Sequence, residues 1–165
     1  MVNPGKLERI LKSKSAMLKQ NPNVLGFYLI GSMANGTATN KSDIDIEIIY
    51  SSRKNYKLID EYIDGVKIGL GFDSISGFIK ECDKNPQNAY ILLNSKILYD
   101  PKGIISYGSK KVRTFFRRNP QIIQYWEEKY SEYKKLKKSK KLRKTYFDVV
   151  NELNKKIKRK EILIY

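Results

Sequence analysis

The sequence predicts an α/β (α+β) domain, residues 1–103, followed by a basic helical extension, residues 104–165, that packs on this core. Three observations support the prediction. Apolar and polar residues alternate with the two-residue period of a half-buried strand over residues 43–50 and 66–72. Residues 24–30 form a continuous apolar run with the length of a buried strand. After residue 103 the apolar residues recur at helical spacing instead.

The core is expected to begin with an amphipathic helix over residues 7–18, because apolar residues recur there at helical spacing and Asn21-Pro22 ends the pattern. Beyond the polar residues 51–55, a short helix or strand leads to the turn pair Asp64-Gly65. The other expected core elements are strands at 24–30, 43–50 and 66–72, a helix at 74–82, a short strand at 96–99 and the closing turn Asp100-Pro101-Lys102-Gly103.

Three helices are expected in the extension. The first covers residues 104–118, and Pro120 opens the second, because proline is favoured at the first position of a helix. The third is indicated by apolar residues at helical spacing: Leu142, Tyr146, Val149, Val150, Leu153 and Ile157.

The composition excludes several kinds of chemistry. The chain has no histidine, which removes Ser-His-Asp and Cys-His nucleophile systems and histidine-ligated metals. Cys82 is the only cysteine, so no internal disulfide can form and a zinc site has almost no ligands; we expect a buried, inert thiol. The apolar run at 24–30 is far shorter than the roughly 20 residues that span a bilayer, and the N-terminus lacks a signal-peptide pattern. We therefore expect a soluble cytoplasmic protein without a membrane partner.

One segment combines residues that suit phosphate and metal binding. Gly31 and Ser32 follow the apolar run, ten residues separate Ser32 from Asp43, and Asp45 follows after one more residue. Glycine at a strand end lets another group approach the backbone, and a serine that begins a helix offers a hydroxyl to a phosphate. At strand spacing Asp43, Asp45 and Glu47 point to one side, where a divalent cation such as Mg²⁺ relieves the repulsion between carboxylates.

Either half of this segment alone is an ordinary turn or an ordinary amphipathic strand. Together, over about residues 7–103, they resemble the Gly-Ser, ten residues, Asp-x-Asp signature of the polymerase-β-like nucleotidyltransferase superfamily, especially its minimal prokaryotic members. The resemblance implies a small mixed β-sheet flanked by helices. It also implies Mg²⁺, ATP or another nucleoside triphosphate, and transfer of a nucleoside monophosphate to a hydroxyl with release of pyrophosphate.

The resemblance also implies roles for individual residues. Gly31 and Ser32 match the triphosphate-binding corner, and Asp43 and Asp45 match the metal ligands. We add Ser42, next to Asp43, to the expected nucleotide-binding residues.

The chain departs from the family pattern at the third carboxylate. The family usually carries this acid on a later strand, near position 69 here, but the residue is Gly69. Asp73 is the nearest acid on the same strand face and becomes, with Asp43 and Asp45, an expected catalytic residue; Glu47 is the next choice. The alternative for Asp73 is the N-cap of the helix that begins near Ser74. A slow enzyme or a nucleotide-binding pseudoenzyme stays possible in this reading.

The positive charge is concentrated in the extension. Residues 1–101 carry 13 Lys and Arg against 11 Asp and Glu, whereas residues 102–165 carry 20 against 6. Clusters of Lys and Arg at residues 134–144 and 155–160 favour RNA, such as tRNA, as acceptor or partner. The affinity for RNA would then fall as the salt concentration rises. Genome composition or thermophilic surface usage is the alternative. Nearby aromatic residues either stack on bases or form the core between helices: Tyr125, Trp126, Tyr130, Tyr133 and Tyr146.

Three further possibilities remain at the level of sequence. Minimal members of the resembled family often act with a helical HEPN-type toxin, as an antitoxin that attaches AMP to the toxin's tyrosine, so a HEPN-type protein is an expected alternative partner. A non-catalytic module that binds nucleotide or nucleic acid is the second. Aminoglycoside-modifying enzymes share the fold, but the basic extension would repel cationic drugs.

Overall fold

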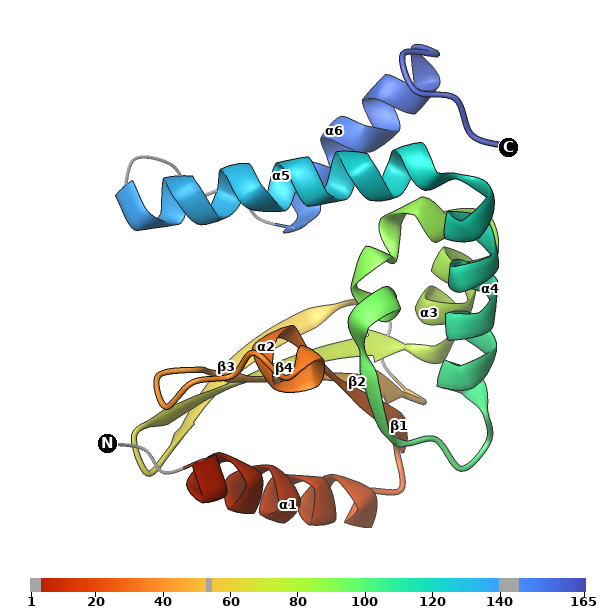
Figure 1. The fold of residues 1–165 in the computed structure, drawn as a ribbon. Helices are drawn as coiled ribbons and strands as arrows, with labels where there is room; N and C mark the ends of the chain where they lie inside the picture. The colour runs from red at the N-terminus through yellow and green to blue at the C-terminus, as the bar shows by residue number, and fades with distance from the viewer. Residues whose placement is uncertain (1–3, 53–54, 140–145) are drawn as a thin grey trace.

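A single mixed sheet forms the centre of the computed structural model, which describes residues 4–52, 55–139 and 146–165. The strands run in the order β3-β4-β2-β1-β5 (Figure 1). β2 and β4 pair in parallel and the other neighbours pair antiparallel, so the expected small mixed sheet is confirmed. The strands are β1 (Val24–Ile30), β2 (Ile44–Tyr50), β3 (Lys57–Ile63), β4 (Val66–Ser74) and β5 (Lys96–Tyr99).

Helices cover the two faces of the sheet. The helices and 3-10 turns are α1 (Pro4–Gln20), α2 (Gly31–Asn35), α3 (Ile75–Lys84), η1 (Pro86–Asn88), η2 (Tyr90–Asn94), α4 (Ile104–Arg118), α5 (Pro120–Ser139) and α6 (Tyr146–Lys158). In Figure 1 α1 lies below the sheet, and α5 and α6 lie above it. None of the described helices has both the length and the apolar character needed to cross a membrane.

The alternation of side chains along the strands separates two hydrophobic cores. On one face Phe27, Ile46 and Ile68 pack with Leu7 and Ile10 of α1. On the other face the core joins the sheet to the helices, and its buried members are Tyr28, Ile49, Phe78, Cys82, Ala89, Leu92, Ile105, Val112, Phe116, Ile122, Tyr125, Trp126, Val149 and Leu153. Asp45 and Glu47 alternate with Ile46, so they lie on this second face, beneath the helices.

The structure settles several expectations about single elements. The segment before Asp64, for which the sequence allowed either a helix or a strand, is strand β3. Asp64 and Gly65 both have positive φ, 49° and 78°, as in a tight hairpin turn. β2 begins at Ile44, so Asp43 directly precedes the strand. The helix expected over residues 104–118 is α4, and Leu142 of the last expected helix lies outside the described residues.

The N-cap alternative for Asp73 is wrong. The cap of α3 is Ser74, whose side-chain oxygen accepts a hydrogen bond from the backbone N–H of Gly77 at 2.9 Å. A capping side chain must belong to the last non-helical residue, and β4 continues through Asp73 to Ser74. The carboxyl group of Asp73 therefore lies on the second face of the sheet and does not cap α3.

The core alternative for the aromatic residues of the extension is confirmed where the structure describes them. Trp126 is fully buried and Tyr125 is nearly so, and Tyr130 and Tyr146 pack against the same core. Trp126 stacks on Tyr90 and on Tyr146, with ring centroids 5.2 and 4.9 Å apart. The side chain of Tyr133 lies outside the described residues.

Candidate active site

The Gly-Ser corner and the second aspartate of the motif meet where β1 and β2 pair. Ile30 at the end of β1 is the register partner of Asp45. The next residue, Gly31, has a φ of +72°, and a Cβ there would lie 3.3 Å from Oδ2 of Asp45. A side chain at this position would be both strained and crowded, because positive φ is readily adopted only by glycine. The structure thus holds the open corner directly against the Asp45 carboxylate.

A second glycine opens the space on the other side of Asp45. Gly69 of β4 is the register partner of Asp45 on β2 and of Asp60 on β3. A Cβ at Gly69 would lie 2.6 Å from Oδ1 of Asp45 and 3.8 Å from Oδ1 of Asp60. The missing side chain leaves a hollow over the β4 backbone, bordered by carboxylate oxygens from both neighbouring strands.

The donor chemistry of this hollow fits Mg²⁺, which prefers carboxylate oxygens and commonly uses one or two of them together with substrate phosphates. Among the described residues, no three Asp, Glu, Cys or His side chains converge into a ready metal cluster. A cation at Asp45 would therefore rely in part on triphosphate oxygens, which is the arrangement expected for a nucleotide-bound magnesium ion.

Asp43 is exposed and lies two residues before Asp45. Its charge contributes to raising the pKa of Lys67, for which the hydrogen bond to Asp60 is the largest cause. The Lys67 ammonium lies 3.1 Å from Oδ2 of Asp60, and both side chains are more than a third exposed. This exposed ion pair is weak and exchangeable, so it leaves the hollow accessible to another cation.

Two expected nucleotide-binding serines differ in their surroundings. Ser42 closes a tight loop: its hydroxyl accepts a hydrogen bond from the backbone N–H of Thr39 at 2.8 Å. Ser32, in the first turn of α2, is partly exposed, and its carbonyl accepts a hydrogen bond from the backbone N–H of Thr37 at 3.0 Å. The Ser42 hydroxyl has a structural use in this loop, whereas Ser32 lies beside Gly31 at the corner.

Glu47 forms a buried polar pair next to the hollow. It pairs in register with Gly71, and the Tyr56 hydroxyl donates a hydrogen bond to Oε1 of Glu47 at 3.0 Å. Burial raises the pKa of Glu47 to about 7, with a smaller contribution from the charges of Asp73 and Asp45, while the Tyr56 hydrogen bond opposes the rise. Glu47 is therefore a carboxyl group that takes up or releases a proton near neutral pH.

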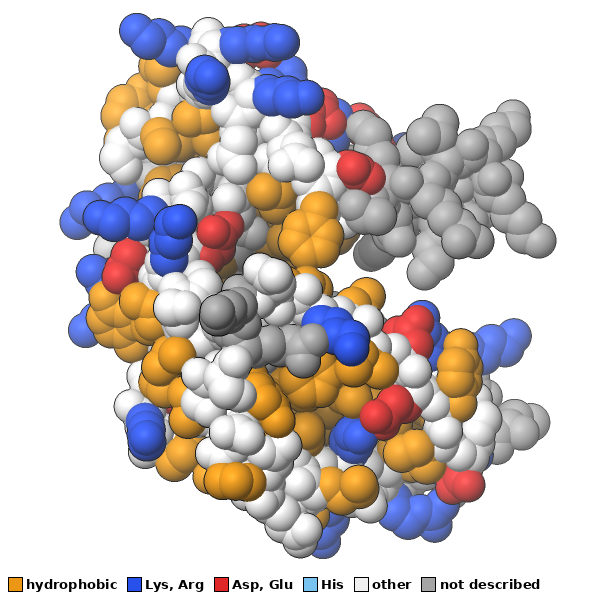
Figure 2. All heavy atoms as spheres, turned by 180° about the vertical axis from the view of Figure 1, so that it is seen from behind, with side chains coloured by type: hydrophobic (Ala, Val, Ile, Leu, Met, Phe, Trp, Pro, Cys, Tyr) orange, Lys and Arg blue, Asp and Glu red, His pale blue; other side chains and the backbone are white. Residues whose placement is uncertain are grey.

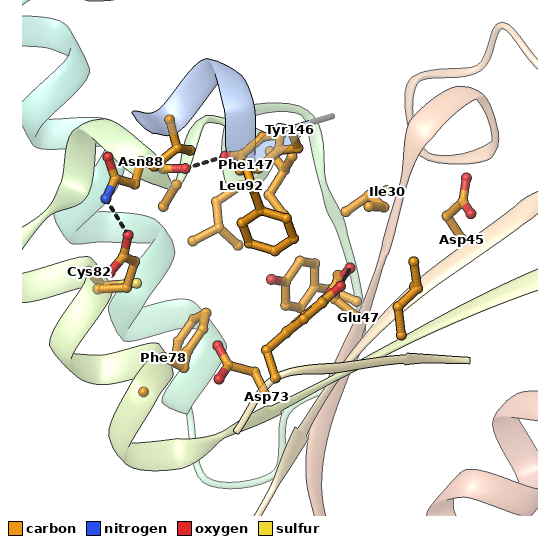
Figure 3. Close-up of a pocket in the computed structure, with 18 of the residues that line it drawn as sticks. Ile30, Asp45, Glu47, Asp73, Phe78, Cys82, Asn88, Leu92, Tyr146 and Phe147 are labelled. Carbon is orange, nitrogen blue, oxygen red and sulfur yellow. Dashed lines mark hydrogen bonds between the residues drawn. The ribbon is translucent and has the colours of Figure 1, made fainter. Parts of the chain in front are cut away.

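Asp73 lies further along the sheet. It pairs in register with Ile49, four residues beyond Asp45 and Gly69, which at strand spacing is roughly 13 Å along the strand. Burial raises its pKa, and a hydrogen bond from the Ser74 backbone opposes this. Figure 3 shows Asp45 and Asp73 at opposite ends of the site with Glu47 between them.

A cavity of about 760 Å³ extends from Asp45 under the helices. Its described lining includes four acids, Asp45, Glu47, Asp73 and Glu81, and no Lys or Arg. The remaining walls are mostly apolar and come from the sheet, α3, the 3-10 turns, α5 and α6, with Phe78 and Phe147 visible in Figure 3. Figure 2 shows the corresponding recess between the helical layer and the sheet, with hydrophobic side chains beside it.

Sequence reasoning missed three residues of this site. Tyr56 follows a polar segment without periodicity, and Asp60 lies in a segment that could not be assigned as strand. Phe147 lies on α6, and its ring meets the ring of Tyr56 edge to face at 5.7 Å. The two-residue spacing of a strand puts Leu58, Asp60 and Tyr62 on one face of β3. This spacing was the only signal that could have indicated the face on which Asp60 lies.

Comparisons with known proteins address the family and the fold. The family model described as "Polymerase beta, Nucleotidyltransferase" matches residues 12–107. The fold is similar to that of a nucleotidyltransferase-like protein from Exiguobacterium sibiricum, with a TM-score of 0.51 and 9% sequence identity over 65% of this chain. The match spans 38% of the length of that protein. None of the curated proteins compared with the chain matches it.

Proposed function

The chain belongs to the polymerase-β nucleotidyltransferase family, and from this premise we propose that it is a Mg²⁺-dependent nucleotidyltransferase. The proposed reaction transfers a nucleoside monophosphate from a nucleoside triphosphate, ATP in the first instance, to a hydroxyl group on RNA or protein. The observation that carries the proposal is that the Asp45 carboxylate lies next to the Gly31 corner, which brings the two halves of the motif together.

In the proposed reaction Gly31 and Ser32 hold the triphosphate, and Asp43 and Asp45 hold the cation beside it. When bound, Mg²⁺ neutralises the charge that develops on the phosphate oxygens and on the leaving pyrophosphate. A side chain at Gly31 or at Gly69 would crowd the Asp45 carboxylate, so the two glycines leave its oxygens accessible to a cation.

A carboxylate must accept the proton of the attacking hydroxyl. Asp73 and Glu47 both line the cavity, and Glu47 is nearer to Asp45 along the sheet. The raised pKa of Glu47, about 7, suits a proton acceptor at neutral pH. Glu47 is therefore a better proposal for this base than Asp73, although its hydrogen bond from Tyr56 must then be exchanged for one from the acceptor.

The experiment that tests the proposal incubates the protein with each α-labelled nucleoside triphosphate, Mg²⁺, and either total RNA or co-purified protein. Wild type should transfer label to one of the two, and Asp45→Asn should reduce transfer by at least about 100-fold. Asp64→Asn, in the exposed β3–β4 turn, is the matched control. Absence of label from both acceptors, with Asp45→Asn equal to wild type, would reject an enzyme.

A non-catalytic binding module is the second candidate, and Gly69 favours it, since the usual third carboxylate is missing from β4. Calorimetric binding of a non-hydrolysable ATP analogue without any transfer would support this candidate. Transfer of AMP to the tyrosine of a co-purified HEPN-type partner would instead identify the protein acceptor and an antitoxin role.

A further inference from the structure

We propose that Asp60 of β3 replaces the carboxylate that β4 lacks, and that the divalent cation binds over Gly69 between Asp45 and Asp60. The inference rests on the proposed function and assigns a metal ligand that lies on a different strand from both aspartates of the motif.

Strand register places Asp60 in line with Asp45 across the sheet. Strands β2, β4 and β3 are neighbours in the sheet (Figure 1). Asp45 on β2, Gly69 on β4 and Asp60 on β3 form one row across them. In-register residues on neighbouring strands point to the same face. Asp60 is thus the only acid of the described β3 strand in the same row as Asp45.

Gly69 leaves space between the carboxylates of Asp45 and Asp60. Oδ1 of Asp45 and Oδ1 of Asp60 both lie within 4 Å of the point that a Cβ at Gly69 would occupy, at 2.6 and 3.8 Å. Any side chain at residue 69 would fill the space between the two oxygens. Because residue 69 is glycine, β4 carries no carboxylate at this position. The carboxylates of Asp45 on β2 and Asp60 on β3 can therefore both approach the space over Gly69.

The Asp60 carboxylate already has a positively charged neighbour. The Lys67 ammonium is 3.1 Å from Oδ2 of Asp60. The ammonium marks a position next to the Asp60 carboxylate where positive charge is stabilised. A divalent cation would compete with Lys67 for Asp60.

Asp73 and Glu47 are less well placed than Asp60 to bind the same cation. Asp73 is four residues further along β4 than Gly69. Glu47 is in the next row, over Gly71, and its Oε1 is engaged by Tyr56. Asp60 alone among these acids approaches the Gly69 hollow that Asp45 borders.

The test measures Mn²⁺ affinity by calorimetry, with and without a non-hydrolysable ATP analogue, so that activity is not required. Asp60→Asn should weaken Mn²⁺ binding by at least about tenfold, and Asp73→Asn should not change it. Lys67→Gln should tighten Mn²⁺ binding in the absence of nucleotide, because the competing ammonium is gone. Asp64→Asn and Lys57→Gln are the matched controls for loss of an acid and loss of a lysine in the same hairpin.

The outcomes separate this inference from the proposed function. If Asp45→Asn abolishes Mn²⁺ binding while Asp60→Asn matches wild type, the Asp60 assignment is rejected and the nucleotidyltransferase site stands. If Asp60→Asn weakens binding but Lys67→Gln equals Lys57→Gln, competition by Lys67 is rejected and the ligand role of Asp60 stands. If neither aspartate affects Mn²⁺ binding, both the inference and the proposed cation site are rejected. Thermal melts of each variant exclude loss of folding as the cause.

Discussion

Glu47 shows how a single buried side chain links stability to pH. Its pKa in the folded protein is about 7 against an ordinary value of 4.5, so the folded state holds a proton that the unfolded state has released between these pH values. The free energy of unfolding should therefore fall as pH rises through this window, by up to about 3 kcal/mol. Glu47→Gln should remove most of this slope and retain an oxygen that accepts from Tyr56.

The measurement is urea unfolding at pH 5 and pH 8. Glu8→Gln, an exposed acid of α1, is the control and should keep the wild-type slope. An equal pH dependence in wild type and Glu47→Gln would show that Glu47 titrates normally in the folded protein.

Single residues also mark the limit of what sequence could predict. The two-residue period identified the correct face for Asp45, Glu47 and Asp73, because side-chain direction is a local property of a strand. Distance along the sheet depends on register, which is set by pairing between strands far apart in sequence. For that reason Asp73 was expected to complete the site although it lies four residues away, and Asp60 was not considered.

At the scale of elements, the start of α3 depends on the Ser74 cap. Ser74→Ala removes the acceptor for the Gly77 N–H and should lower the free energy of unfolding by about 1 kcal/mol. Ser13→Ala is the control, because Ser13 is an exposed serine of α1 and does not contact the α3 cap. Urea titration of both variants gives the comparison, and equal stability of the two would contradict the cap.

Helix α6 adds a wall to the cavity that sequence could not foresee. Periodicity predicted a helix with a buried face, and Val149 and Leu153 form that face. Phe147, 56% exposed, lies off this stripe and meets Tyr56 across the cavity. A local pattern indicates which face of a helix is buried, but it does not identify the surface that the rest of the helix approaches.

Phe147→Ala should therefore affect substrate binding more than stability. We expect KM for triphosphate or acceptor to rise several-fold, while the free energy of unfolding changes by about 1 kcal/mol or less. Tyr62→Ala removes another exposed aromatic, on β3 and outside the cavity lining, and should leave KM unchanged. A loss of stability in Phe147→Ala without any change in KM would assign this ring a packing role only.

At the scale of the whole molecule, the second core joins the sheet to the helices that follow it. Trp126 of α5 is fully buried, and its indole N–H donates a hydrogen bond to the carbonyl of Gln87 at 2.9 Å. Trp126→Ala should lower the free energy of unfolding by about 3–5 kcal/mol, since it leaves a large cavity and an unpaired carbonyl. Near-ultraviolet and far-ultraviolet signals should still melt together, and separate transitions would show that the helices unfold independently of the sheet.

Charge is distributed unequally over the molecule, and this bears on the RNA partner that we propose. The described lining of the cavity is acidic, whereas the chain carries 33 Lys and Arg against 17 Asp and Glu. Much of the basic cluster at 134–144 lies outside the described residues. On the described surface a groove along α4 is lined by three exposed cations, Lys110, Arg113 and Arg117.

If RNA binds through this basic surface, the logarithm of its affinity should fall linearly with the logarithm of salt concentration, with a slope of about 0.7 per phosphate contact on a single strand. Replacing the three α4 cations with Gln should reduce that slope by up to about 2. The control variant loses the same charge elsewhere, at Lys12, Lys57 and Lys84. Filter binding between about 50 and 200 mM salt measures both slopes. Equal slopes for the two variants would exclude α4 as the contact surface, and an affinity independent of salt would exclude electrostatic binding of RNA altogether.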